Sequence, residues 1–390
     1  MMKRKIRALA GILLLALILA ACGSGDTADT TAASEPSDAN PTTTAAPVEA
    51  MDDCSEVQAM IDATAGMSAE DRTAYLLPLA DEAGPISLYT ELNGRDTTAL
   101  ADIFDDTYGI DLQVYRAGSE DVRLRVLEEA SAGFRGLDLV EIEALDMTIL
   151  DQEGVLAPAS SPHRAGLIEA GIFDNFSADR VTYIVPVWNE SIIAEGDIPQ
   201  SFEDLADERF AGLMALEDSD IYWFAVIVND LIAQGMTEDE AVGVFQAIAA
   251  NSSITSGHTT TLELLIAGEY GITPNGYSHR VEQFKLEDAG LEWLPVNAPV
   301  VAEITAVGVA CNAVNPAGAL LLEDFFLDPA TTQAFFVEVN RTPSNSDLQA
   351  VAFGPGGAGI EPLKGDVAAI VADFEKWTDL WDSVIRSSGG

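Results

Sequence analysis

Strand-like and helix-like segments alternate along the first half of the folded part of this chain, and this order constrains the fold most. Residues 85–90 and 137–142 are short and mostly apolar, and residues 110–115 alternate between apolar and polar side chains. Residues 97–108 carry apolar side chains at helical spacing, and 119–132 form a second predicted helix. Strands that alternate with helices at this interval predict a parallel sheet covered by helices on both faces.

The second half of the chain continues in the same way. Residues 201–204 have the composition of a helix start, and Thr237 and Glu240 have the spacing of a capping box, which opens another helix. The predicted strands are 213–216, 270–273 and 302–311, and the predicted helices are 222–234, 237–250, 261–267, 316–327, 329–340 and 366–385. The sequence therefore predicts a second α/β lobe beside the first.

The first 22 residues have the pattern of a bacterial export signal. Four basic residues precede an apolar run, and small residues lead to Cys22. The apolar core is too short to cross the ~30 Å hydrocarbon layer of a membrane comfortably. The ending resembles a lipobox, so residues 1–21 are predicted to be a lipoprotein signal peptide and Cys22 to carry lipid. The protein would then work outside the cytoplasm, anchored to the cell membrane.

The residues after Cys22 are predicted to be a tether. Residues 22–50 consist mainly of Gly, Ser, Thr, Ala, Pro and Asp and contain no aromatic residue, so they cannot bury enough apolar surface to fold. The rest of the chain is long enough for two lobes. The predicted boundaries are 51–187 for the first part of lobe 1, 188–298 for lobe 2, 299–350 for the return to lobe 1, and 351–390 for a loop and a C-terminal helix.

The chain is strongly acidic. Its net charge is −45, and removing the signal peptide takes away four basic residues and no acidic ones, which leaves −49. A field of this sign repels polyanions, which excludes nucleic acid as a partner. Adaptation to a salty medium is the favoured interpretation of the acidity, ahead of a direct role in binding.

The chain has three cysteines. With Cys22 assigned to the lipid, Cys54 and Cys311 remain, and in an oxidising compartment they are predicted to form a disulfide. The alternative is two separate buried thiols, because the sequence does not show that the two sites meet. Two isolated cysteines do not predict a metal site.

Several short motifs, in collinear order over residues 80–343, resemble the substrate-binding proteins of bacterial ABC importers. The motifs are 80–84 (ADEAG), 201–205 (SFEDL), 209–212 (RFAG), 266–269 (IAGE), 315–319 (NPAGA) and 340–343 (NRTP), and the later ones resemble the ferric-iron, thiamine and polyamine branch. The resemblance implies a type 2 periplasmic-binding-protein fold, with two α/β lobes joined by crossing strands. It also implies a monomer that traps a small ligand between its lobes and delivers it to a permease.

Ligands of such sheets sit beyond the carboxyl ends of the strands, so the loops that follow the predicted strands supply the candidate site. Gly118 and Asp220 lie in these loops. The residues predicted to bind ligand are Thr90, Glu91, Asn93, Ser119, Glu141 and Glu143 from the first lobe, Asp218, Ser219, Tyr222, Asn275 and Tyr277 from the second, and Glu303 near a hinge crossing. The many carboxylates among them favour a cation.

Fe(III) is the first predicted cargo, because it is a hard ion that prefers carboxylate and phenolate oxygens. The candidate metal ligands are Tyr222, Tyr277, Glu91 and Glu141. The iron-binding relatives implied by the resemblance use two adjacent tyrosines, whereas residues 222–224 here read Tyr-Trp-Phe.

Two other kinds of ligand remain open. An organic cation such as thiamine or a polyamine would be held by aromatic faces and carboxylates. A phosphonate or sugar phosphate would use the predicted helix starts at Ser119 and at 259–261, where free backbone N–H groups favour anions.

Catalysis is not predicted. His163, His258 and His279 lack metalloprotease spacing, and no nucleophile elbow or phosphate-loop lysine occurs. Residues 354–359 match a dinucleotide-binding pattern, but no strand precedes them and no helix follows directly, so a surface loop is expected. No cofactor is predicted. A tethered extracytoplasmic enzyme is the alternative from another class, and an interaction or sensing lipoprotein is a further one.

Overall fold

The computed structural model of the protein describes residues 54–294, 298–349 and 360–388, all of which belong to one compact unit, Pro47–Gly390. The predicted signal peptide, Cys22, the tether and residues 354–359 lie outside the described residues. No helix in the described ranges is long and apolar enough to span a membrane.

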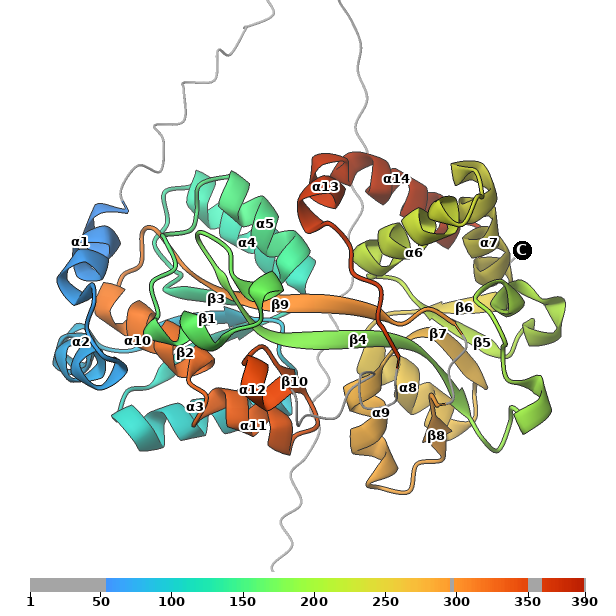
Figure 1. The fold of residues 1–390 in the computed structure, drawn as a ribbon, viewed down its shortest axis with the longest axis horizontal. Coiled ribbons are helices and arrows are strands. Elements are labelled where there is room, and N and C mark those ends of the chain that lie inside the picture. Colours follow the sequence, from blue (N-terminus) through green and yellow to red (C-terminus); the bar gives the residue numbers. More distant parts are fainter. Residues whose placement is uncertain (1–53, 295–297, 350–359, 389–390) are drawn as a thin grey trace, which may run out of the picture. The chain divides into compact units, whose positions relative to one another are not determined.

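A ten-stranded mixed sheet organises the unit (Figure 1). Its main path is β2-β1-β3-β9-β4-β7-β5-β6, and β8 and β10 both pair with β4. The strands are β1 Ile86–Thr90, β2 Leu112–Arg116, β3 Leu139–Glu143, β4 Ser177–Asn189, β5 Met214–Glu217, β6 Ser252–Thr255, β7 Ile272–Tyr277, β8 Leu291–Glu292, β9 Val301–Val309 and β10 Thr342–Pro343.

The predicted parallel pairing holds within two groups of strands. β1 pairs in parallel with β2 and β3, and β5 pairs in parallel with β6 and β7. β9 runs antiparallel to β3, and β4 runs antiparallel to both β9 and β7. The two parallel groups are therefore joined through an antiparallel centre. We call the part built on β1–β3 the N-lobe and the part built on β5–β7 the C-lobe.

β4 and β9 run from one lobe to the other (Figure 1). The N-lobe helices are α1 Ser55–Thr64, α2 Ala69–Ala83, α3 Gly94–Tyr108, α4 Ser119–Ser131, α5 Ala144–Gln152, α10 Pro316–Leu327, α11 Thr332–Glu338 and α12 Ser346–Gln349. The C-lobe helices are α6 Ile221–Ala233, α7 Glu238–Asn251, α8 His258–Ala267, α9 Ser278–Lys285 and α14 Phe374–Ile385, and α13 Val367–Ala372 contacts α5 of the N-lobe as well as α6 and α14. Short 3₁₀ turns occupy Pro162–Gly166, Glu169–Gly171, Glu195–Asp197, Glu203–Ala206 and Glu208–Phe210.

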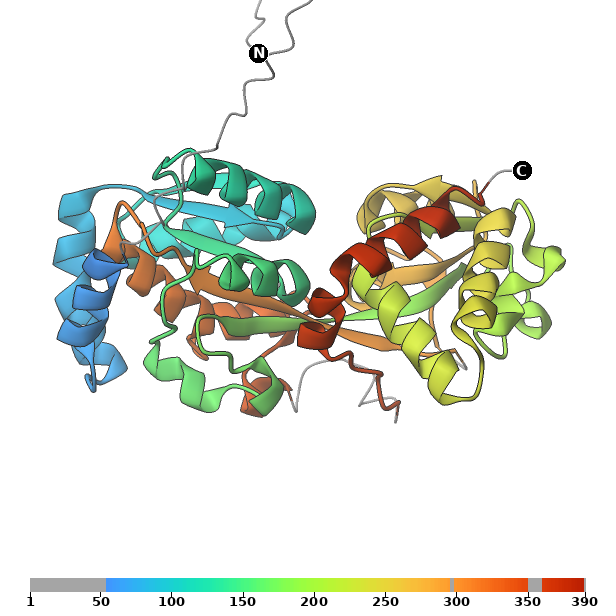
Figure 2. The same ribbon diagram turned by 90° about the horizontal axis from the view of Figure 1, so that it is seen from above.

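The end of the described chain returns to the C-lobe. Figure 2 shows α14 alongside α6, and Trp377 and Trp381 of α14 are buried in the same apolar cluster as Trp223 and Phe245. The apolar clusters of both lobes are made from residues of this unit alone. A protein that starts at Pro47 therefore keeps every buried apolar contact described here.

Most predicted elements form within a few residues of their expected ends, and the capping box of Thr237 and Glu240 is present. Two expectations were wrong in detail, and one long strand was missed. The helix predicted at 329–340 covers only Thr332–Glu338, and the single helix predicted at 366–385 is divided at Asp373. β4 was not predicted, because Asp179, Arg180 and Pro186 interrupt its apolar pattern.

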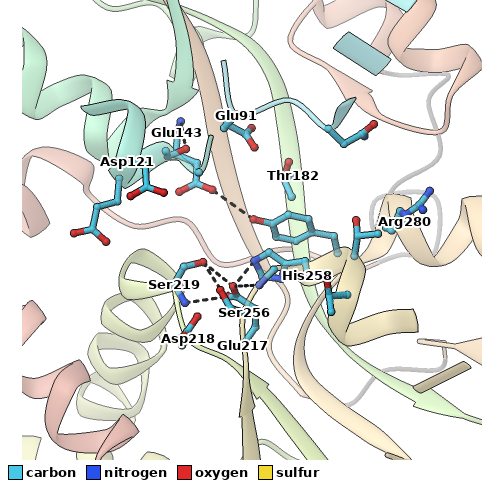
Figure 3. Close-up of a pocket in the computed structure, with 18 of the residues that line it drawn as sticks. Glu91, Asp121, Glu143, Thr182, Glu217, Asp218, Ser219, Ser256, His258 and Arg280 are labelled. Atoms are coloured by element: carbon cyan, nitrogen blue, oxygen red, sulfur yellow. Dashed lines mark hydrogen bonds and ion pairs between the residues drawn. The ribbon is translucent and has the colours of Figure 1, made fainter. Parts of the chain in front are cut away.

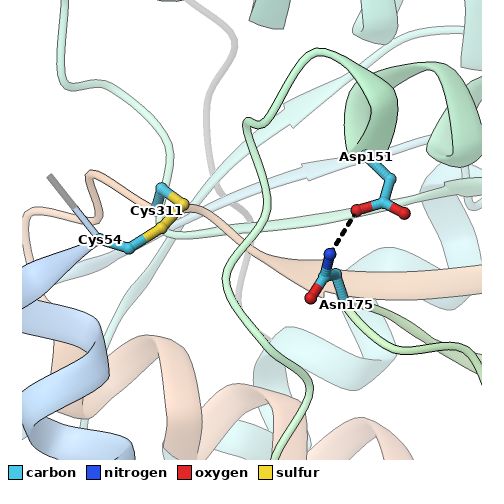
Figure 4. The surroundings of a disulfide bond; sticks show 4 residues. All are labelled: Cys54, Asp151, Asn175 and Cys311. Carbon is cyan, nitrogen blue, oxygen red and sulfur yellow. Dashed lines mark hydrogen bonds between the residues drawn. A yellow bond between two sulfur atoms is a disulfide. The ribbon is translucent and has the colours of Figure 1, made fainter. Parts of the chain in front are cut away.

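The predicted disulfide is formed (Figure 4). Cys54 lies immediately before α1, and Cys311 follows β9 and is buried in the N-lobe core. The two cysteines are 257 residues apart in sequence. The bond therefore joins the start of the described chain to the strand that returns from the C-lobe.

We expect Cys54→Ser and Cys311→Ser together to lower the free energy of unfolding by about 2–5 kcal/mol, because a crosslink across so long a loop restricts the unfolded chain. Chemical denaturation of residues 47–390 would measure the change. Reducing agent should destabilise the unsubstituted protein equally and leave the double variant unaffected; equal stability of the two proteins in oxidising buffer would contradict the prediction.

Candidate functional site

A cleft of about 660 Å³ lies between the lobes. Its walls are the loops that follow β1, β2 and β3 in the N-lobe and β5, β6 and β7 in the C-lobe, so the carboxyl ends of both parallel groups face it (Figure 3). Eight residues named from the sequence line it: Glu91, Asn93, Gly118, Ser119, Glu143, Asp218, Ser219 and Tyr277.

Two of the predicted metal ligands do not line the cleft. The hydroxyl of Tyr222 accepts a hydrogen bond from the backbone N–H of Gly365 at 2.8 Å, and it lies 3.4 Å from the carbonyl oxygen of Ala302. Glu141 is fully buried beneath the cleft, where it accepts hydrogen bonds from Thr90 and Arg180. Tyr277 and Glu91 are the two predicted metal ligands that reach the cleft.

Arg180 of β4 compensates one group of acids. It is buried and forms ion pairs with Glu91, Glu141 and Asp179. Asp179 is the extra residue at an irregularity in the pairing of β4 with β9. Burial, partly offset by Arg180, raises the pKa of Asp179 to about 8. Glu91 and Glu141 therefore have a cationic partner before any ligand arrives.

A second group of acids has no such partner among the residues that the structure describes. Glu143 ends β3, and its Oε1 accepts a hydrogen bond of 3.4 Å from the Tyr277 hydroxyl of the other lobe. Glu303 of β9 is buried opposite Thr182, and its Oε2 has no hydrogen-bond partner in the described part of the chain. Burial and then the neighbouring carboxylates raise the pKa of both Glu143 and Glu303 well above the ordinary value. This part of the cleft has more negative charge than its protein partners balance.

Tyr277 is at the centre of this group. Burial first, and then Glu143, raise the pKa of its hydroxyl well above the ordinary value. Its ring stacks on His258 with a centroid distance of 3.6 Å and on His279 at 5.5 Å. Without a bound cation the phenol therefore keeps its proton.

A third cluster lies on the C-lobe side of the cleft. His258 Nε2 is 3.5 Å from Glu217 Oε2 (Figure 3). It is 3.1 Å from Asp220 Oδ1. The predicted residue Asn275 lies behind this cluster and donates a hydrogen bond of 2.7 Å to Asp220. Although burial alone would lower it, the two carboxylates raise the pKa of His258 to about 10.

Basic groups also reach the cleft. Arg116, Arg280 and Arg341 line it, and Arg341 forms an ion pair of 2.9 Å with Asp96. The N-cap residues of α4 and α8 are Gly118 and Gly257, so neither helix has a side-chain cap. Thr259 and Thr260 line the cleft, whereas Thr261 is buried and bonds to Thr255.

Sequence reasoning missed Arg180, Glu217 and His258. Glu217 is the last residue of β5, and His258 starts the helix that follows β6, so the rule that directs attention to loops after strands covers both positions. The expected strand ended one residue too early, and β6 was not predicted. Arg180 lies in the unpredicted strand β4, so no signal in the sequence pointed to it.

We expect Glu303 to contribute progressively less to the stability of the ligand-free protein as the pH rises from about 5 to about 8, because it binds its proton more tightly in the folded than in the unfolded state. A carboxyl group whose pKa is higher in the folded state than in the unfolded state stabilises the fold below the unfolded-state pKa. This stabilisation is lost as the pH rises through the folded-state pKa. Glu303→Gln should therefore stabilise the protein by about 1–3 kcal/mol at the higher pH and by less at the lower one. Denaturation of both proteins at the two pH values would measure this, and a constant difference would contradict it.

The sequence profile of the bacterial extracellular solute-binding protein family matches residues 99–356. No curated protein sequence matches the chain. The described structure is similar to iron-bound HitA from Pseudomonas aeruginosa, with a TM-score of 0.64 and 16% identity over 77% of this chain and 99% of that one.

Two further solved structures have the same arrangement. AfuA from Actinobacillus pleuropneumoniae with fructose-6-phosphate bound has a TM-score of 0.61 and 21% identity over 78% of this chain and 97% of that one. The ferric binding protein from Campylobacter jejuni has a TM-score of 0.63 and 17% identity over 77% of this chain and 99% of that one. At such identities the likeness establishes the fold, which is the type 2 periplasmic-binding-protein fold.

The family profile covers the strands that cross between the lobes and most of the loops that form the cleft. The chain belongs to the bacterial extracellular solute-binding protein family, whose members bind solutes for ABC transporters.

Proposed function

We propose that this protein captures a cation in the cleft between its lobes, Fe(III) or a ferric complex in the first place, and delivers it to the permease of an ABC importer. The activity is binding rather than catalysis. Lipid on Cys22 would anchor the protein to the cell membrane on its extracytoplasmic side, and residues 23–50 would form the tether.

One observation carries the proposal: Glu143 and Glu303 are acids of the cleft region without a basic partner among the described residues, next to the Tyr277 hydroxyl. Removing carboxylates from water is costly unless a cation or hydrogen-bond donors compensate them. Arg180 already forms ion pairs with Glu91 and Glu141, so its charge is not available to balance Glu143. A cation between the lobes would supply the missing charge.

The chemistry of these groups favours a hard metal ion. Carboxylate and phenolate oxygens suit Fe(III). A bound trivalent cation would also reverse the effect of the neighbouring acids on Tyr277, because the ion becomes the largest local charge and favours the phenolate.

Binding of the cation would close the two lobes on each other, because its ligands lie on different lobes. Glu143 belongs to the N-lobe and Tyr277 to the C-lobe, and the lobes are joined by β4 and β9. A cation that contacts both side chains gains more contact energy in the closed form than in the open form, so binding shifts the population toward closure. The permease would recognise that closed form.

An organic cation is the second candidate. The rings of Tyr277, His258 and His279 stack on one another beside the carboxylates. Thiamine or another aromatic cation would extend this stack and bind by stacking and charge together.

Titration of residues 47–390 with ferric citrate tests the first candidate. We expect a visible phenolate-to-iron absorption band together with a rise in melting temperature, because a ligand that binds only the folded state stabilises it. Tyr277→Phe should abolish the band and weaken binding at least about 100-fold, as expected for the loss of a direct metal ligand.

Tyr222→Phe is the matched control, since it removes a buried hydroxyl that does not line the cleft. It should keep the band. Thiamine, spermidine and fructose-6-phosphate are titrated in parallel. Stabilisation by one of these without colour, and none by iron, would reject Fe(III) as the cargo.

A further inference from the structure

Three side chains of the C-lobe converge on one point beside the acids just discussed. Glu217, Asp220 and His258 each direct one possible metal-ligand atom there, and these atoms lie within 4.8 Å of one another. Glu217 ends β5, Asp220 precedes α6, and His258 starts α8. The whole cluster therefore belongs to one lobe and does not depend on closure.

The hydrogen bonds fix the orientation of the imidazole. His258 Nδ1 is 3.0 Å from the backbone carbonyl oxygen of Asn275, and a carbonyl oxygen only accepts. Nδ1 must therefore carry a hydrogen, which directs Nε2 toward Asp220 and Glu217. A backbone carbonyl on one ring nitrogen is how metal-binding histidines are commonly held.

The two carboxylates are held in place by other groups. Asn275 donates to Asp220 Oδ2 at 2.7 Å and leaves Oδ1 facing the histidine. Glu217 accepts from the backbone N–H groups of Ser219 at 2.8 Å and Gly257 at 2.9 Å. Both acids are thus positioned before any ion arrives, which lowers the ordering cost of binding one.

Charge balance indicates what the cluster would hold. Two carboxylates and one protonated imidazole leave one negative charge, whereas two carboxylates, a neutral imidazole and a divalent cation are balanced. Glu217 and His258 line the cleft, so water or a solute can reach a further position on the ion. Mixed imidazole and carboxylate ligands suit Mn²⁺, Fe²⁺, Co²⁺ and Zn²⁺, whereas Ca²⁺ and Mg²⁺ prefer oxygen alone.

We propose that Glu217, Asp220 and His258 form a divalent transition-metal site on the C-lobe, separate from the Glu143 and Tyr277 pair. The site goes beyond the proposed function, because it needs neither Fe(III) nor contact between the lobes.

Titration of residues 47–390 with Co²⁺ and Zn²⁺, followed by calorimetry and by the visible absorption of Co²⁺, tests this proposal. One ion should bind per chain. Asp220→Asn and His258→Gln should each weaken binding at least about 100-fold, as expected for lost ligands. Asp218→Asn removes a cleft charge between Glu217 and Asp220 in sequence and leaves the three ligands in place, so it measures the general electrostatic effect, which should stay below about threefold. Equal losses in Asp218→Asn and Asp220→Asn, or no saturable binding, would overturn the proposal.

Pulsed electron paramagnetic resonance of the Cu²⁺-loaded protein gives a readout that does not depend on variant stability. The chain has three histidines, so a coordinated imidazole nitrogen can be assigned. The signal should be present in the unsubstituted protein, persist in His279→Gln and disappear in His258→Gln. Absence of the signal in the unsubstituted protein would overturn the proposal.

The two proposals can fail independently. Tyr277→Phe should lose the iron band yet bind Co²⁺ at its full stoichiometry. Iron binding without Co²⁺ binding rejects the C-lobe site and leaves the proposed function standing. Co²⁺ binding without iron binding rejects Fe(III) as the cargo and leaves the C-lobe site standing.

Discussion

The antiparallel pairing of β4 with β9 is the constraint on which the rest of the structure depends. Through these two strands both parallel groups share one sheet, so the carboxyl ends of all their strands face a common cleft. Seven register pairs join β4 and β9, from Ser177 with Val307 to Ile184 with Val301. The disulfide of Cys311 fixes the chain just beyond β9 to the start of α1. A relative movement of the lobes would therefore bend β4 and β9 where they pass between the lobes, and it would also shift α13 against α5.

The same strands determine where the cleft is neutral and where it is charged. β4 contributes Arg180, whose guanidinium balances Glu91, Glu141 and Asp179, whereas β9 contributes Glu303 without a matching cation. A single buried arginine thus divides the acids into a compensated group that supports the structure and an uncompensated group beside Tyr277. Replacing a surface carboxylate would change little, because water screens it. In the uncompensated group Glu303 is buried and Glu143 is half-buried at the wall of the cleft, so water screens their charge less than at the surface and protons or a ligand must balance it.

Local sequence patterns predicted the elements well where apolar spacing was regular. The motif at residues 315–319 also has a visible structural reason: the Asn315 side chain caps α10 and donates to the carbonyl oxygens of Ala80 and Gly84. β4 escaped prediction because its function as a crossing strand places charged residues in a buried segment. The loop rule found Glu143 and Tyr277, but it could not separate them from Glu141 and Tyr222. That distinction depends on where Arg180 and Gly365 lie, and both contacts join residues far apart in the sequence.

The two groups of acids in the cleft differ in whether one lobe or both lobes supply their side chains. Glu217, Asp220 and His258 are complete on the C-lobe, with Asn275 and two backbone N–H groups holding them in position. Glu143 and Tyr277 meet only across the cleft, over 3.4 Å, so an ion held by both depends on the separation of the lobes. A ligand at the first place has the same direct ligands in any arrangement of the lobes, so it shifts their equilibrium less than a ligand at the second place, which contacts both lobes. Under the proposed function the permease must distinguish loaded from empty protein, and a ligand of the pair that spans the cleft would supply that signal.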